Sequence, residues 1–348
     1  MEGEINNFFK VWILVLASLS YCYVVGKTVS KGTKRLIFVI PIVCLFLMLP
    51  LKLTSVNLGV TTSFFITWLA NFKLLLFAYG KGPLALDPSL SFGRFLVISC
   101  LPIDIRENPS HKSPKQKRQK KWHLRFTIKL LVLAILISVF NCKEHLHPKV
   151  LLVLYWPLVY ILVETILAVV AAMAGAMVGL ELEPHFNEPY LSTSLLDFWV
   201  NRWNLTVSRI MRLAVYEPTL SLWAPLVGLK WAQIPAVVGS FLVVGLVHEL
   251  VYYYVCRVPP TWEVTWFFVL HGTVLTAEIG LKKAFITDTW RLPRVVSVSL
   301  TLGFVTLTGY WLFFPQIIRC NFDAWLMQEY AALGEFLRNV SQRLMFFS

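Results

Sequence analysis

Long apolar runs alternate with short polar segments along most of the chain. A helix that crosses a bilayer needs about 20 mostly apolar residues, and the pattern predicts about eight such spans. Two more apolar stretches, Phe95–Ile103 and Leu220–Trp231, are too short and predict re-entrant or interfacial helices. The predicted spans are Phe8–Gly26, Leu36–Leu51, Leu58–Tyr79, Phe126–Phe140, Val150–Leu180, Ile234–Cys256, Trp262–Leu281 and Val295–Ile318. The predicted fold class is therefore all-α, a polytopic transmembrane helix bundle that forms one membrane-embedded domain over residues 1–348.

The composition places lipid around this bundle. Hydrophobic residues make up 57% of the chain and charged residues only 15%, whereas soluble domains carry about 25% charged residues. The formal net charge of +13 would suit nucleic acid, but no folded polar domain is left to present a basic patch, so no nucleic-acid partner is expected. Glu2 and Glu4 precede the first apolar run, which predicts a retained span and not a signal peptide.

Basic residues gather in alternate loops, as expected when cytosolic loops retain positive charge. With the N-terminus outside, the cytosolic side holds the basic loop at about 104–125 and the segment at about 181–218. We expect an endoplasmic reticulum protein in this orientation. The basic residues of the cytosolic loops include Lys27, Lys31, Lys34, Arg35, Arg106, Lys112, Lys115, Lys117, Arg118, Lys120, Lys121, Arg125, Arg202, Arg209, Arg212, Lys282, Lys283, Arg291 and Arg294, whereas the loops between spans on the opposite side hold Lys52, Lys143, Lys149 and Arg257.

The cysteines and histidines argue against a metal or redox centre. The six cysteines lie far apart without a C-x-x-C pair, which argues against zinc and against a disulfide scaffold. Only His145 and His147 are clustered, so the several histidine boxes of a membrane di-iron enzyme are absent. The sequence also lacks H-x-x-x-D, G-x-S-x-G and an Asp-His-His-Cys motif, which argues against soluble-type acyltransferases, serine hydrolases and palmitoyltransferases. No metal and no cofactor are expected.

Three ionisable side chains fall near the middle of predicted spans, where a charge costs on the order of 3 kcal/mol. They are Glu164, His248 and His271. The short turn Arg257–Thr261 joins the spans that hold the two histidines and puts both at similar depth. Glu249 adjoins His248, and Glu278 shares a face with His271. Such residues serve either as interhelical hydrogen-bond partners or in function. The two readings remain open for Glu164, whereas function is favoured for the histidines.

A second candidate site lies in the cytosolic segment that follows the fifth span. It interleaves aromatic residues with asparagine and arginine, and a plain aromatic belt at the membrane interface does not require two asparagines and an arginine within four residues. We therefore interpret it as a binding site. Its residues run Phe198, Trp199, Val200, Asn201, Arg202, Trp203, Asn204.

Taken in order, these stretches resemble the membrane-bound O-acyltransferase superfamily, in its plant wax-synthase-like branch. The resemblance covers nearly the whole chain. It is carried by Trp68–Phe77, Phe186–Leu191, Asp197–Trp199, Arg202–Leu205, Val247–Glu249, Trp262–Thr265 and Phe267–Gly272. It implies transfer of a fatty acyl group from acyl-CoA to the hydroxyl of a lipophilic alcohol.

The resemblance also implies roles for individual residues. His248 matches the family's membrane-embedded catalytic histidine, a general base for the alcohol proton. Asn204 matches the asparagine that closes the motif F-Y-x-D-W-W-N of larger relatives, and an amide donor there would position the thioester or stabilise the developing oxyanion. Asn201 and Arg202 replace the motif's acidic residue and first paired tryptophan. Substrate binding is expected from Phe198, Trp199, Arg202, Trp203, His271 and Glu249, with Arg202 meeting acyl-CoA phosphates.

Several alternatives remain open at this level. The acceptor could be a long-chain fatty alcohol, which would yield a wax ester, or a sterol or diacylglycerol. The donor could be a long-chain acyl-CoA or acetyl-CoA. A lipid transporter or channel would also carry ionisable residues at mid-membrane, and inverted repeats, which would support that class, are not evident. The oligomeric state cannot be inferred from the sequence.

Overall fold

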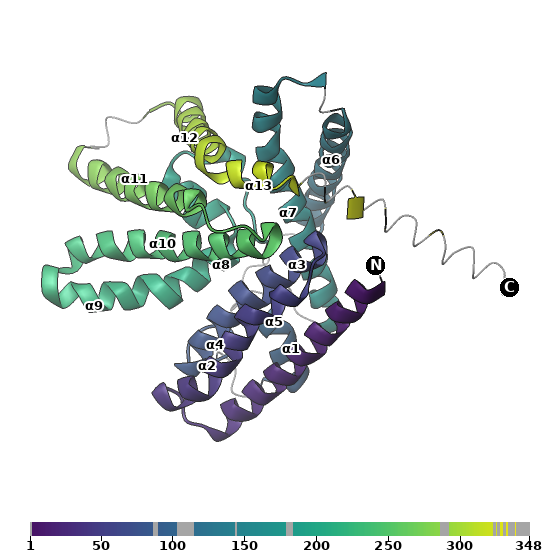
Figure 1. Cartoon of the computed structure of the whole chain (residues 1–348). Coiled ribbons are helices and arrows are strands. Elements are labelled where there is room, and N and C mark those ends of the chain that lie inside the picture. The colour runs from purple at the N-terminus through teal and green to yellow at the C-terminus, as the bar shows by residue number, and fades with distance from the viewer. Residues whose placement is uncertain are drawn as a thin grey trace. The chain divides into compact units, whose positions relative to one another are not determined.

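A computed structural model of the full chain describes residues 2–85, 90–102, 115–142, 145–178, 184–285 and 292–322, with five residues between 325 and 338. Every regular element in these ranges is helical (Figure 1). The chain divides into two compact units. The first unit comprises Met1–Leu101, Arg209–Phe285 and Trp311–Ser348, and the second comprises Pro102–Ser208 and Ile286–Tyr310.

Most of the helices belong to the first unit. Its elements are α1 (Glu2–Thr28), α2 (Thr33–Met48), the 3₁₀ turn η1 (Leu49–Lys52), α3 (Val56–Thr62), the π-helix η2 (Ser63–Ala70), α4 (Asn71–Ala78), α5 (Phe92–Cys100), the π-helix η6 (Arg212–Tyr216), α9 (Glu217–Val227), α10 (Leu229–Cys256), α11 (Glu263–Phe285) and α13 (Pro315–Arg319). The second unit holds α6 (Lys115–Asn141), α7 (Pro148–Val178), the 3₁₀ turn η4 (Pro189–Leu191), the π-helix η5 (Asp197–Arg202) and α12 (Arg294–Thr308). Two elements, α8 (Leu205–Met211) and the π-helix η7 (Gly309–Phe313), cross the boundaries.

Seven helical stretches among the described residues are long and apolar enough to cross a membrane. They coincide with seven of the predicted spans, so the prediction of an all-α, multi-pass membrane protein is confirmed. The remaining predicted span, Phe126–Phe140, lies in α6 and is not among the seven. Of the predicted basic loop at about 104–125, residues 104–114 lie outside the described residues, whereas residues 115–125 begin α6 and are helical, so the loop prediction is wrong for this part. The candidate spans are Gly3–Thr28, Thr33–Lys52, Val56–Ala78, Val153–Ala176, Leu229–Cys256, Glu263–Lys282 and Arg294–Phe313.

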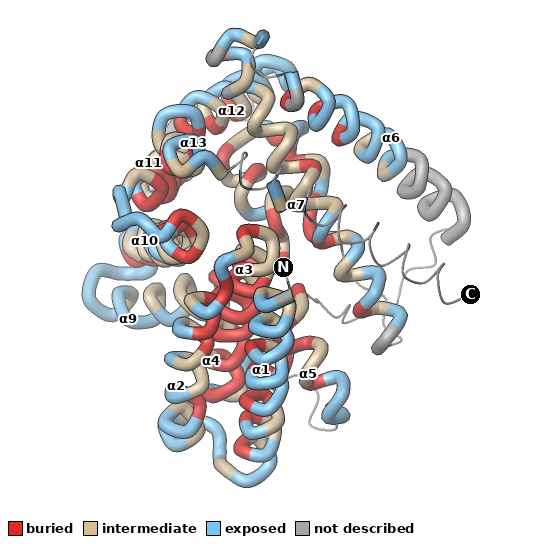
Figure 2. Tube along the Cα trace, turned by 45° about the vertical axis from the view of Figure 1, so that its right-hand side comes forward, coloured by how far each residue is buried: buried red, intermediate tan, exposed pale blue. Residues whose placement is uncertain are grey.

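The stretch α3–η2–α4 forms the core of the first unit. Within its most apolar window 72% of the residues are buried, against 17–39% for the other candidate spans (Figure 2). Such burial favours the pairing of polar groups, although Trp68 Nε1 and Asn71 Oδ1 of this stretch have no hydrogen-bond partner among the described residues. Thr67 donates to the carbonyl of Phe46 at 3.0 Å. The ammonium of Lys73, which is fully buried, donates to the carbonyls of Ile98 and Leu101 at the end of α5, at 2.7 and 2.6 Å.

One predicted segment is wrong in its boundaries. Leu220–Trp231 was expected to form one short helix, but Gly228 divides it between α9 and α10. Gly228 has φ +80°, a left-handed conformation that glycine adopts without steric cost. The chain reverses there, and α9 packs along α10 (Figure 1).

The cysteine spacing also missed one pairing. A disulfide joins Cys256 at the end of α10 to Cys320 just after α13, with Cα atoms 5.6 Å apart. Sixty-four positions separate the two in sequence, and only the packing of the first unit brings them together. The remaining four cysteines are free thiols. The expectation that disulfides do not build the scaffold therefore holds for these four and is wrong for the pair Cys256–Cys320.

The second unit contains the α6–α7 hairpin. Leu133, Leu136 and Ile161 form its apolar contact. One helical turn before Leu133, Lys129 of α6 donates to both carboxylate oxygens of Glu164 of α7, at 2.6 and 2.8 Å. The question left open for Glu164 therefore has a structural answer, because this carboxylate is the interhelical partner of a lysine.

Candidate active site

His248 stands on α10 among aromatic rings of the first unit. Its ring centroid lies 4.9 Å from that of Trp68, 4.5 Å from Phe268 and 5.9 Å from Phe313. Its Nδ1 lies 2.8 Å from the carbonyl oxygen of Val244, one turn earlier. A carbonyl oxygen can only accept, so Nδ1 carries the hydrogen, and in the neutral ring the lone pair lies on Nε2. The backbone thus fixes the tautomer that a general base needs.

His271 lies in the packed interior of the first unit. It is fully buried, and its ring centroid is 4.2 Å from that of Phe267. His248 stands eight residues before the end of α10, and His271 eight residues after the start of α11. At 1.5 Å per residue, each ring lies about 12 Å along its helix from the connecting turn. His271 therefore packs at the same distance from the turn as His248.

Glu249 caps the beginning of α11. Its Oε1 accepts a hydrogen bond from the backbone N–H of Thr265 at 3.3 Å, in the first turn of that helix. The two helices approach closely here, and the absence of a side chain at Gly245 allows it. A Cβ atom at this position would stand only 2.9 Å from the Cα of Thr265. The other oxygen, Oε2, is buried and has no hydrogen-bond partner in the described part of the chain.

The predicted aromatic segment forms a cluster around Trp203 in the second unit. The ring of Trp203 stacks on Phe198 at 5.4 Å and meets Phe186 edge-on at 5.2 Å. It also contacts two rings of α7, Trp156 and Tyr160, each at 6.0 Å. Tyr160 is near the middle of the 31-residue α7, so the segment folds back along that helix and does not extend beyond its end.

Asn204 adopts a left-handed backbone with φ +37°, which asparagine tolerates better than most residues. Its Oδ1 accepts from the N–H of Val207 at 3.4 Å and so caps α8. With the oxygen used in this way, the amide nitrogen Nδ2 remains as the side chain's donor. The side chain is buried, so this donor lies in a largely dry environment, where hydrogen bonds are stronger than in water.

Two backbone hydrogen bonds, one on each side of Asn204 in sequence, join its segment to residues 185–187 and form a short ladder. The N–H of Asn187 donates to the carbonyl of Arg202 at 2.9 Å, and the N–H of Leu205 donates to the carbonyl of His185 at 2.8 Å. The Nδ1 of His185 lies 2.9 Å from the hydroxyl of Thr206, and both side chains are buried. His185 and Thr206 thus hold the segment on either side of Asn204. Neither residue could be assigned a role from the sequence, because their contact depends on the chain folding back on itself.

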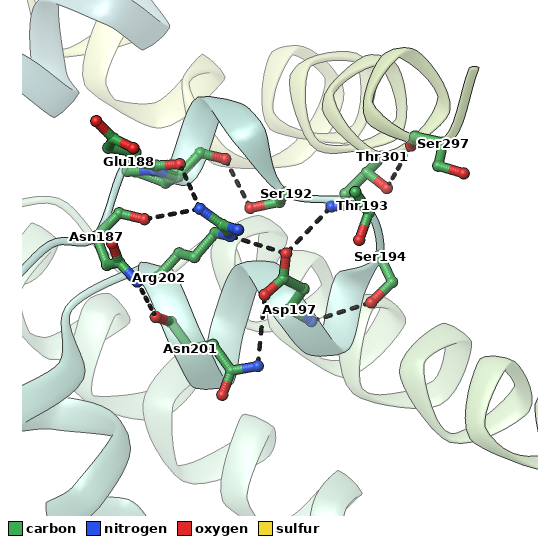
Figure 3. A network of polar contacts seen from close by, with 11 residues as sticks. Asn187, Glu188, Ser192, Thr193, Ser194, Asp197, Asn201, Arg202, Ser297 and Thr301 are labelled. Atoms are coloured by element: carbon green, nitrogen blue, oxygen red, sulfur yellow. Dashed lines mark hydrogen bonds and ion pairs between the residues drawn. The ribbon is translucent and has the colours of Figure 1, made fainter. Parts of the chain in front are cut away.

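Arg202 ties this ladder to the π-helix that precedes it (Figure 3). Its Nε donates to Asp197 at 2.8 Å, and one terminal nitrogen donates to the carbonyls of Asn187 and Glu188 at 3.1 and 3.3 Å. Arg202 is therefore engaged within the chain, as a clamp on the loop. If Arg202 also bound the phosphates of acyl-CoA, as predicted, its guanidinium would have to serve them in addition to Asp197 and the two carbonyls.

Asp197 completes the clamp. Burial tends to raise its pKa, but hydrogen bonds from Arg202, the N–H of Thr193 and the amide of Asn201 outweigh burial, and the pKa is lowered. The carboxylate is therefore ionised at neutral pH. The stability that this pair contributes is present above the ordinary aspartate pKa of about 3.9 and is lost only as the pH falls through the lowered value.

A double-mutant cycle distinguishes a clamp from a phosphate contact. As a clamp, Arg202→Ala and Asp197→Ala should each raise the KM for acyl-CoA by about tenfold, the value of a charged hydrogen bond. The double variant should be no worse than either single one, because both remove the same interaction. If Arg202 served only the phosphates, Asp197→Ala would leave the KM unchanged. The exposed Arg212→Ala is the matched control.

The predicted site residues fall into two groups. His248, Glu249 and His271 lie in the first unit, each with partners of its own. The second unit brings together Phe198, Trp199, Arg202, Trp203 and Asn204. Trp68, Phe313, Asp197, His185 and Thr206 join them without a predicted role. Within the described residues, no group of three or more His, Cys, Asp or Glu side chains is arranged to hold a metal ion.

Together, these features define a multi-pass membrane protein with an ionisable side chain, His248, inside a candidate membrane-spanning helix. Residues 182–270 match the model of the membrane bound O-acyl transferase family. An acyl-CoA–sterol O-acyltransferase of Arabidopsis thaliana is 45% identical over 97% of this chain and 98% of its own length. A probable long-chain-alcohol O-fatty-acyltransferase of the same plant is 45% identical over 92% and 94%. The long-chain-alcohol O-fatty-acyltransferase of Simmondsia chinensis is 43% identical over 96% of both chains.

The chain therefore belongs to the membrane bound O-acyl transferase family, and it is an acyltransferase.

Proposed function

We propose that this enzyme transfers a fatty acyl group from acyl-CoA to a long-chain alcohol and so forms a wax ester. The observation that carries the proposal is the tautomer of His248, whose Nε2 is left to accept a proton among apolar rings of the membrane-embedded unit. The substrate class is supported by relatives named long-chain-alcohol O-fatty-acyltransferases at 43–45% identity over most of the chain.

The proposed reaction needs only groups that the chain carries. His248 Nε2 takes the hydroxyl proton while the alcohol oxygen attacks the thioester carbonyl. The oxyanion that forms accepts a hydrogen bond from Asn204 Nδ2. The carbon–sulfur bond then breaks, and the departing CoA thiolate takes the proton from His248, which gives ester and free CoA. The thioester is already an activated acyl donor, so acyl-CoA is a co-substrate and the reaction calls for no metal or redox cofactor.

A sterol is the second candidate acceptor. The relative named acyl-CoA–sterol O-acyltransferase matches 97% of this chain at 45% identity, the same identity as the first of the long-chain-alcohol enzymes. A sterol also offers one hydroxyl on a large apolar body, so the same histidine chemistry would serve it.

Labelled long-chain acyl-CoA, given with a panel of alcohols to microsomes from a host that makes no such esters, tests the proposal. The expected product is a labelled wax ester, formed faster with a C16 or C18 primary alcohol than with a sterol or diacylglycerol. Faster sterol ester formation would select the second candidate. Failure to form an ester with any alcohol would overturn the proposal.

The proposed setting is the endoplasmic reticulum membrane, with the aromatic segment on the cytosolic side. In this orientation Cys256 and Cys320 lie on the luminal side, where disulfides form and persist. The orientation also requires α6 to cross the bilayer next to α7, because the α6–α7 turn and the aromatic segment must then face opposite compartments.

Cysteine accessibility measures this crossing. In intact microsomes, a membrane-impermeant maleimide should label Val200→Cys, which is 47% exposed in the aromatic segment, without permeabilisation. Cys142, which is exposed at the end of α6, should be labelled only after permeabilisation. Both are tested one at a time in a Cys44→Ser background. Labelling of both sites from the same side would mean that α6 does not cross.

A further inference from the structure

A groove of about 450 Å³ runs along α10 and into the turn that leads to α11. It is lined by Leu246, Glu249, Leu250, Tyr253, Pro260 and Trp262. Four of these are spaced along one face of α10, at intervals of three and four residues. Leu246, Tyr253 and Trp262 are each more than a third exposed, and in a spanning helix such surface faces lipid. The groove is thus open to the bilayer.

Glu249 supplies the only carboxyl group in this apolar lining. Its Oε1 is used by the N–H of Thr265, whereas its buried Oε2 has no partner among the described residues. An unpaired buried acceptor destabilises the fold, so a donor that reaches it would relieve that cost.

Trp262 adds a second irregularity at the same place. Its backbone φ is +64°, which is a strained value for a bulky side chain. Strain of this kind persists only where the surroundings enforce it and is concentrated at ligand sites. Here it holds the indole at the wall of the groove.

We propose that this groove is the docking site for the acceptor alcohol, with its hydrocarbon along α10 and its hydroxyl donating to Glu249 Oε2. The inference rests on the proposed function and locates its acceptor. A lipophilic alcohol complements the groove, because it has a single hydrogen-bond donor for Oε2 and an apolar body for the apolar lining. Glu249 follows His248 directly on α10, so the groove lies at the same depth along that helix as the base.

The same chemistry separates substrate from product. An ester has oxygens that accept but no O–H that donates, so it cannot satisfy Oε2 as the alcohol does. The groove therefore favours the alcohol over the ester, which can leave into the bilayer. Sites that hydrogen-bond a substrate hydroxyl reject analogues that lack it.

Filling the groove is the kinetic test. Leu246→Trp should raise the KM for the alcohol by about tenfold, the scale of a lost pocket contact, with the KM for acyl-CoA unchanged. Leu242→Trp, one turn earlier on α10, is the matched control, because the two leucines are 41% and 43% exposed and only Leu246 lines the groove. Equal alcohol KM values for the two variants would overturn the proposal.

A binding test separates the groove from catalysis. The probe is a long-chain primary alcohol with a diazirine and an alkyne on its chain, and its O-methyl ether, which cannot donate, is the reference. In full-length His248→Ala protein, the alcohol should label the peptide containing Leu246–Tyr253 more strongly than the ether does, and Glu249→Leu should abolish the difference. Equal labelling by alcohol and ether would show an ordinary lipid contact and overturn the inference. Selective labelling in a protein whose wild type forms no ester would leave the groove standing while the proposed function fails.

Discussion

Replacing His248 with alanine should lower kcat by about 10²–10⁴-fold, the usual contribution of a general base. The KM for acyl-CoA should change little, because in the proposed mechanism the ring acts on the alcohol proton. The measurement is ester formation by purified protein reconstituted into lipid, at saturating acyl-CoA and alcohol.

The control for this variant is His145→Ala, which changes an exposed histidine between α6 and α7. It should retain wild-type activity. A His248→Ala protein that elutes as the wild type does, binds acyl-CoA and is inactive would support the base. One that is folded and retains more than about a tenth of wild-type kcat would show that another group takes the proton.

Replacing Asn204 with aspartate should lower kcat by about 10²–10³-fold, the cost of losing one oxyanion donor. The substitution is close to isosteric. Aspartate can cap α8 through its carboxylate and tolerates the left-handed backbone, so the fold of the segment is preserved. What disappears is the N–H donor of Nδ2. Single-turnover ester formation measures this loss separately from substrate binding.

Two companion variants give this experiment its contrast. Asn204→Gly keeps the left-handed backbone without any side chain, and it should lose activity to the same extent as Asn204→Asp. Asn201→Ala, which removes an exposed amide of the same segment, should stay near wild type. If Asn204→Asp is fully active and Asn204→Gly is not, the residue serves as a helix cap alone.

The spans were predictable because lipid imposes a length and a composition on each of them. The segment Ile234–Cys256 could be read directly, and only its start moved, to Leu229. The turn at Gly228 was missed because apolar residues continue on both sides of it, and hydropathy does not register a reversal within an apolar run. The glycine itself was the available signal.

The contacts that build the site were harder to predict. His248 could be selected because an ionisable group in an apolar helix stands out, but the ring of Trp68 beside it comes from a π-helix that sequence periodicity does not indicate. The partner of Glu164 required the register of α6 against α7. Arg202 was expected to be available to phosphate, and its engagement with Asp197 and two carbonyls depends on a loop that folds back.

The pairing of Lys129 with Glu164 has a consequence for how the protein is made. A lone lysine in the apolar part of α6 would oppose entry of that helix into the bilayer by on the order of 3 kcal/mol, and a lone glutamate would do the same in α7. Once the two side chains meet, each neutralises the other's charge. In the proposed orientation α6 crosses the bilayer, and translation completes it before α7 leaves the ribosome, so α6 would wait at the translocon until its partner emerges. Biogenesis of the second unit would then proceed by joint insertion of a hairpin.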